Sequence, residues 1–186
     1  MALSRESRDN FLESVRLFDS RVEATPTDQW SAPSPCEGWA ATNVVAHLVG
    51  NLRSLRLALE GGDFFDGFGK PVEGDLNAAW TTERDELAPL LDGTEPETVT
   101  VRGNPVPLAA IVDGLMRDLV IHTWDFARAV GGDERLPDDL VAAATEAMAM
   151  VGDSARGPGF YGQVVPVAPD ADAQTRLLGL SGRSNA

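Results

Sequence analysis

Apolar side chains recur at helical spacing over most of the sequence, and glycine- and proline-rich stretches separate the periodic segments. The first segment, about residues 4–24, carries Phe11, Val15, Phe18 and Val22 among charged residues, which is typical of an amphipathic helix. The same spacing predicts further helices at four approximate ranges: 41–59, 76–91, 108–130 and 138–151. The pattern therefore predicts an all-α protein with short extra elements.

The stretches between these helices lack a long regular pattern. Residues 30–39, WSAPSPCEGW, predict a proline-rich loop that its two tryptophans pin to the bundle. Residues 61–75 place phenylalanines among glycines, so we expect an irregular crossover that packs its aromatic side chains. Residues 97–108 alternate polar and β-branched residues around Gly103 and Asn104, which predicts a short extended segment or turn rather than a sheet.

The length and composition fit one globular domain. Hydrophobic residues make up 43% and charged residues 24% of the 186 positions, values that exclude a disordered or fibrous chain. We expect a single domain over residues 1–186, in which residues 157–186 form a C-terminal extension that packs on the bundle or trails from it.

The net charge of −14 disfavours nucleic acid and anionic lipid surfaces as partners, because an acidic protein repels both. The sequence begins with charged residues and no apolar leader-like segment, and no later run reaches the length that spans a membrane. We therefore expect a cytoplasmic protein. A homodimer is compatible with the sequence, which does not decide the oligomeric state.

Cys36 is the only cysteine, so the chain has neither an intramolecular disulfide nor a thiolate-rich metal site. Any metal would need imidazole and carboxylate ligands. Cys36 lies in a proline-bounded loop with no neighbouring base in sequence, which favours a structural thiol over a nucleophile or an extra ligand.

Asp118 and His122 are four residues apart in a predicted helix, so their side chains project from the same face and can converge on one ion. That face is otherwise apolar, and burial of an isolated charge there would cost several kcal/mol or more. His47, the only other histidine, also lies on a largely apolar helix face. Two histidines and one carboxylate from facing helices form a three-ligand site with an open coordination position.

An alternative without metal is open at this point, because the D-x-x-x-H spacing is common. In it each histidine bonds a backbone carbonyl and Asp118 pairs with Arg117 or another arginine. Two neighbouring residues have alternatives of their own. Asp125 can accept a hydrogen bond from the His122 ring or bind Arg128 or another cation, and Trp124 is expected to pack rather than to recognise a substrate.

Three motifs resemble one known family. Residues 30–51, WSAPSPCEGWAATNVVAHLVGN, resemble the entry to the second helix of the DinB-like superfamily, and within it the metal-binding domain of the actinobacterial mycothiol-dependent maleylpyruvate isomerase. Residues 118–131, DLVIHTWDFARAVG, resemble the second metal motif of that family. Residues 176–183, RLLGLSGR, resemble the C-terminal signature of its short single-domain members.

The resemblance implies a DinB-like four-helix bundle with a crossover connection, and it places the family's metal ligands on His47, Asp118 and His122. The isomerase has a glutamate where this chain has Asp118. The implied cofactors are a divalent metal, zinc being expected and nickel or another ion remaining open, and a low-molecular-weight thiol as cosubstrate.

The implied function is that of a thiol-dependent, mycothiol-type transferase or isomerase, in which a metal-bound thiolate attacks a small electrophile. Its partners would be the small-molecule thiol and that electrophile. Two alternatives remain open: a metal-hydroxide hydrolase and a non-catalytic metal- or ligand-binding protein. The sequence does not identify a catalytic acid or base.

Overall fold

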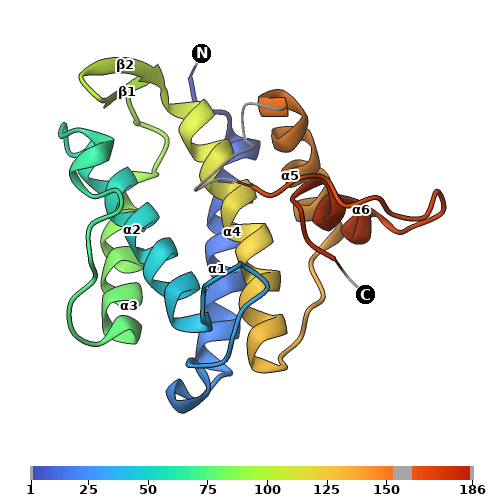
Figure 1. Ribbon diagram of the computed structural model, residues 1–186. Helices are drawn as coiled ribbons and strands as arrows, with labels where there is room; N and C mark the ends of the chain where they lie inside the picture. Colours follow the sequence, from blue (N-terminus) through green and yellow to red (C-terminus); the bar gives the residue numbers. More distant parts are fainter. Residues whose placement is uncertain (1, 153–160, 185–186) are drawn as a thin grey trace.

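The computed structural model describes residues 2–152 and 161–184 (Figure 1). Its helices are α1 (Arg5–Glu23), α2 (Ala41–Leu59), α3 (Leu76–Leu87), α4 (Leu108–Val130), α5 (Asp138–Val151) and α6 (Ala173–Leu180). A small antiparallel hairpin joins β1 (Thr98–Val101) to β2 (Asn104–Pro107), and short 3-10 turns lie at Thr27–Gln29, Phe64–Asp66 and Ala88–Leu90. The predicted all-α fold class is confirmed, because helices dominate the chain.

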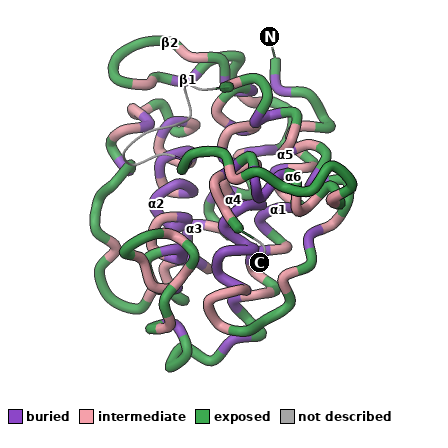
Figure 2. Tube along the Cα trace, turned by 45° about the vertical axis from the view of Figure 1, so that its right-hand side comes forward, coloured by how far each residue is buried: buried purple, intermediate pink, exposed green. Residues whose placement is uncertain are grey.

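Helix α4 is the centre of the bundle. It packs along α1 and against α2, while α3 covers the other side of α2. Helix α5 packs on α4, and α6 packs on α5 (Figure 1). Every residue from Leu119 to Ala127 is consequently buried, on all faces of α4 (Figure 2). Polar residues in this stretch must therefore find partners inside the protein.

The helix ends follow from local chemistry. Ser4 accepts a hydrogen bond from the backbone N–H of Ser7 and so caps α1, and Asp75 caps α3 in the same way. Gly131 ends α4 with a φ of 67°, a left-handed conformation that glycine adopts without a steric penalty. The third helix ends at Leu87, earlier than predicted, because Pro89 has no N–H to continue the helical ladder.

The hairpin corrects one expectation. Residues 97–108 were predicted to form no sheet, but Thr98 pairs with Pro107 and Val101 with Asn104 in an antiparallel ladder. Its turn is Arg102–Gly103, with φ values of 50° and 74°, and positive φ at both turn positions suits the twist of a tight hairpin. Asp63 accepts hydrogen bonds from the N–H groups of both turn residues and so ties the hairpin to the crossover after α2.

The aromatic side chains of the crossover are buried to different extents. Phe64 is buried and Phe65 packs partly against the core, as expected, whereas the side chain of Phe68 is 42% exposed. No helix in the described part of the chain is both long and apolar enough to cross a membrane.

Phe18 joins three helices in the core. Its ring meets Trp80 of α3 edge-on at a centroid distance of 4.7 Å, and it meets Phe126 of α4 at 5.5 Å. The side chain is fully buried. This aromatic cluster holds α1 against the helix that carries Asp118 and His122.

We predict that Phe18→Ala lowers the free energy of unfolding by about 3–5 kcal/mol, because it removes a buried ring and leaves a cavity. Phe68→Ala, the same change at the exposed crossover position, should cost about 1 kcal/mol, for the loss of its ring contacts with Phe64 and Phe65. Urea titration of both variants in metal-free buffer measures the difference. Equal losses in the two variants would contradict the assignment of Phe18 to the core.

Candidate metal centre

The structure brings His47, Asp118 and His122 together between α2 and α4. One ligand atom from each of the three residues lies within 4.8 Å of the other two. His47 Nε2 is 2.7 Å from Asp118 Oδ2, and His122 Nε2 is 3.6 Å from Asp118 Oδ1. The two imidazole rings meet edge-on with their centroids 4.9 Å apart. Each ring thus faces one oxygen of the carboxylate.

Asn51 and Tyr161 also contact Asp118. Asn51 lies one turn after His47 on α2, and its Nδ2 donates to Asp118 Oδ2 at 2.8 Å. The Tyr161 hydroxyl donates to the other carboxylate oxygen at 3.1 Å. Arg117 in turn donates to the Tyr161 hydroxyl oxygen at 3.3 Å. Both oxygens of Asp118 therefore have fixed partners that set the orientation of the carboxylate.

The charges in this cluster stabilise the ionised form of the Asp118 carboxylate. Burial raises the pKa of Asp118, but the charges of His122 and His47 and the hydrogen bonds outweigh it, so the pKa falls well below its usual range. Burial lowers the pKa of His47, and the adjacent Asp118 charge raises it above its ordinary value. The carboxylate is thus ionised in a site that favours cations.

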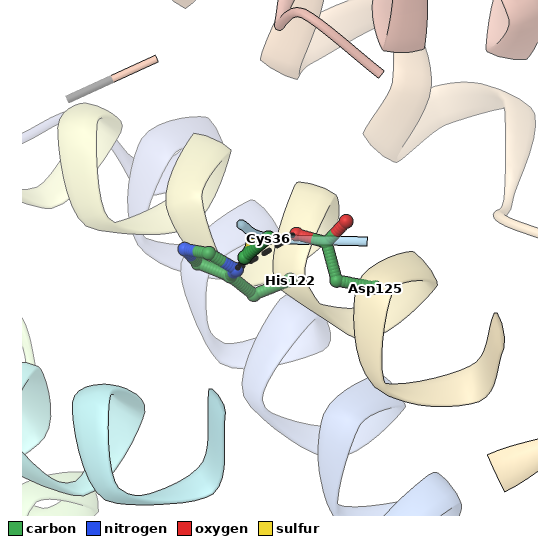
Figure 3. Close-up of side chains that lie close together, drawn as sticks. All are labelled: Cys36, His122 and Asp125. Atoms are coloured by element: carbon green, nitrogen blue, oxygen red, sulfur yellow. Dashed lines mark hydrogen bonds and ion pairs between the residues drawn. The ribbon is translucent and has the colours of Figure 1, made fainter. Parts of the chain in front are cut away.

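Cys36 and Asp125 form a second group with His122 (Figure 3). The Nδ1 of His122 is 2.9 Å from Asp125 Oδ2, and Cys36 Sγ is 3.2 Å from the same oxygen. Cys36 Sγ is 3.9 Å from His122 Nδ1. The two ring nitrogens of His122 therefore face different groups, Asp118 at Nε2 and Asp125 with Cys36 at Nδ1.

Arg183 completes the second group. Its Nη2 donates to Asp125 Oδ2 at 2.7 Å and its Nε to Oδ1 at 3.2 Å, while Nη2 is 3.3 Å from Cys36 Sγ. Burial raises the pKa of Asp125, but the His122 hydrogen bond and the Arg183 charge lower it to about 2. Burial and the Asp125 charge raise the pKa of the Cys36 thiol to about 12.

The loop before α2 presents Cys36 and Trp39 to α4. It closes through backbone hydrogen bonds, from Ser34 N–H to Trp39 C=O at 2.9 Å and from Ala41 N–H to Ala32 C=O at 2.9 Å. The Trp39 ring stacks on His122 at 5.8 Å with an interplanar angle of 12°. The prediction that the tryptophans pin this loop is confirmed, because Trp30 is also buried.

Two groups of side chains thus offer metal ligands in the described residues: His47, Asp118 and His122, or Cys36, His122 and Asp125. The first has an ionised carboxylate and two imidazoles, a donor set that suits zinc and related ions. In the second, the Arg183 guanidinium already pairs with Asp125 and lies 3.3 Å from Cys36 Sγ, so a cation there would meet a fixed positive charge. The donor chemistry therefore fits a divalent cation in the first group.

The structure gives partners to the neighbouring residues whose contacts the sequence left open. Arg117 bonds Tyr161 and the carbonyl of Ala147 rather than Asp118. Asp125 accepts from His122 and binds Arg183, whereas Arg128 pairs with Glu134. Trp124 is 1% exposed, with the Arg128 guanidinium over its ring, which confirms a packing role.

Four residues of the site were not predicted: Trp39, Asn51, Tyr161 and Arg183. The spacing of Asn51, four residues after His47, offered a usable signal, because both project from one helix face. Tyr161 and Arg183 carry no such signal. Their partners on α4 lie 43 and 58 positions away in sequence.

The fold is helical, and two histidines and one carboxylate converge in it as a candidate metal centre. Residues 11–127 match the family model described as the mycothiol maleylpyruvate isomerase N-terminal domain. The chain belongs to this family, which confirms the family resemblance, while the RLLGLSGR motif lies outside the matched residues.

The chain is also similar to two uncharacterized proteins of Mycobacterium tuberculosis, one from strain CDC 1551 / Oshkosh and one from strain ATCC 25618 / H37Rv. Each is 30% identical over 147 residues, which cover 76% of this chain and 78% of the relative. No solved structure gives a significant match.

The surroundings of Cys36 predict a thiol that reacts slowly with alkylating reagents. A pKa of about 12 leaves about one molecule in ten thousand as thiolate near pH 8, so alkylation by iodoacetamide should run about a thousandfold slower than for an ordinary cysteine. The rate should rise steadily with pH up to about 10, and urea-unfolded protein should react at the ordinary rate. A rate that levels off below about pH 9 in the folded protein would contradict this prediction.

Proposed function

We propose that this protein binds one divalent metal ion, zinc by preference, through His47, Asp118 and His122, and uses it in thiol-dependent transferase or isomerase chemistry on a small electrophile. The observation that carries the proposal is that one ligand atom from each of the three residues lies within 4.8 Å of the other two, and that the carboxylate among them is ionised. Membership of the mycothiol maleylpyruvate isomerase N-terminal domain family supports a mycothiol-type thiol as cosubstrate. The small thiol and the electrophile are the proposed partners.

Three protein ligands leave a coordination position for an exogenous group. A divalent ion held there supplies the positive charge that lets a bound thiol lose its proton near neutral pH. The protein's own thiol is not placed to take this part, because Cys36 faces the Nδ1 side of His122 and contacts Asp125 rather than Asp118. The thiol must therefore come from outside the chain.

The chain's residues orient the donors. Asn51 and Tyr161 hold one oxygen each of Asp118, so the carboxylate cannot rotate freely. Burial and the Asp118 charge raise the pKa of Tyr161 well above its ordinary value, so its hydroxyl keeps its proton and remains a donor. The Trp39 ring covers His122 and excludes water from that face.

The unequal exposure of the ligands indicates where a substrate enters. The His47 side chain is 26% exposed and that of Asp118 is 19% exposed, against 7% for His122. We infer that the thiol and the electrophile approach from the side of His47. A cytoplasmic location is part of the proposal, since a single unpaired cysteine suits a reducing compartment.

Cobalt substitution tests the function. Addition of mycothiol or a close analogue to the cobalt-loaded protein should produce a sulfur-to-cobalt charge-transfer band in the near ultraviolet, because the added thiol coordinates as thiolate. Cys36→Ser should leave the band intact, since the sulfur comes from the added thiol. His122→Ala should abolish it by removing a ligand.

Two results would contradict the proposal. A band present before thiol addition and lost in Cys36→Ser would make Cys36 the ligand. No band with any small thiol, together with thiol-independent hydrolysis of esters or amides, would replace the transferase or isomerase by a metal-hydroxide hydrolase.

A further inference from the structure

The C-terminal segment reaches the candidate metal centre although it lies outside residues 11–127, the range that matches the family model. Arg183 follows α6 and places its guanidinium beside Asp125 of α4, with only 10% of its side chain exposed. The Asp125 side chain is fully buried. The ion pair therefore bridges two parts of the chain inside the protein.

The RLLGLSGR sequence explains how Arg183 is held there. Leu177 and Leu178 are fully buried and anchor α6 to the bundle. Gly182 has a φ of 82°, and a Cβ at this position would lie 2.8 Å from the Cα of Gly162. Only glycine fits both the backbone conformation and the close approach. The Arg183 N–H then donates to the Leu178 carbonyl at 2.8 Å, which fixes the backbone of the arginine.

The hydrogen bonds form a chain from Arg183 to His122. Two nitrogens of Arg183 donate hydrogen bonds to the two oxygens of Asp125, and Asp125 Oδ2 lies 2.9 Å from His122 Nδ1. An ionised carboxylate accepts the Nδ1 proton, and this leaves Nε2, which faces Asp118, with its lone pair. A bidentate arginine fixes the carboxylate more firmly than a lysine would.

We infer that Arg183 is a positioning residue that, through Asp125, fixes the tautomer and the orientation of the His122 ring so that Nε2 is free to bind the metal. The inference rests on the proposed metal site for the use of that nitrogen. The C-terminal segment thereby completes the centre formed by α2 and α4. Loss of a direct hydrogen-bond partner of a metal ligand typically weakens metal affinity about 10–100-fold, and Arg183 lies one contact further from the metal than such a partner.

Zinc competition with a chromophoric chelator tests this inference. Arg183→Ala should bind zinc more weakly than the unaltered protein, by up to about 10-fold. Millimolar methylguanidinium should restore much of the affinity by refilling the place of the guanidinium. Arg176→Ala is the matched control, because Arg176 is exposed on α6 and its Nε contacts the backbone carbonyl of Asp172 at 3.4 Å. It should bind zinc as the unaltered protein does.

A second measurement does not depend on metal. The chain has two histidines, so ¹⁵N NMR of the imidazoles in metal-free protein resolves each ring. At about pH 8.5 His122 should carry its proton on Nδ1 in the unaltered protein and in Arg176→Ala, because Asp125 accepts that proton. Arg183→Ala should show a mixture of the two tautomers, and methylguanidinium should reverse the change.

The outcomes separate the inference from the proposed function. Unchanged zinc affinity and an unchanged His122 tautomer in Arg183→Ala would overturn the inference, and so would a loss that methylguanidinium does not reverse while the tautomer stays fixed. Failure of the unaltered protein to bind zinc or another divalent ion would overturn the proposed function instead. The tautomer measurement alone would then decide the role of Arg183.

Discussion

Two carboxylates of α4 face different nitrogens of the His122 ring, Asp125 fully buried and Asp118 largely buried with 19% of its side chain exposed. A buried carboxylate costs several kcal/mol unless charged or polar partners compensate for the lost water. Asp125 obtains a guanidinium, a fixed positive charge. Asp118 obtains two imidazoles, an amide and a phenol, partners that orient it while its charge still favours a cation. The same helix thus carries one closed site and one open site.

This division assigns separate tasks to the elements of the fold. Helices α2 and α4 supply the metal-binding side chains, and the bundle core holds the two helices in register. The loop before α2 covers His122 with Trp39 and packs Cys36 against Asp125. The C-terminal segment supplies Arg183 from the other side. The site therefore depends on contacts that converge on α4 from several distant parts of the chain.

Much of this could be predicted from the sequence. Helical periodicity gave the bounds of α1, α2, α4 and α5, and the spacing of Asp118 and His122 placed both on one face. The hairpin was missed because its turn depends on backbone φ at Arg102, where positive values are uncommon for a residue with a side chain. Arg183 was missed because nothing local links it to Asp125, and the pairing exists only once α6 packs on the bundle.

The central claim is that His47, Asp118 and His122 bind the metal and that Cys36 does not. X-ray absorption at the zinc edge of the loaded, thiol-free protein measures the ligand atoms directly. The account predicts nitrogen and oxygen neighbours at about 2.0–2.1 Å with the scattering pattern of two imidazoles, and no sulfur. A sulfur neighbour at about 2.3 Å before any thiol is added would contradict it and place the ion at Cys36, His122 and Asp125.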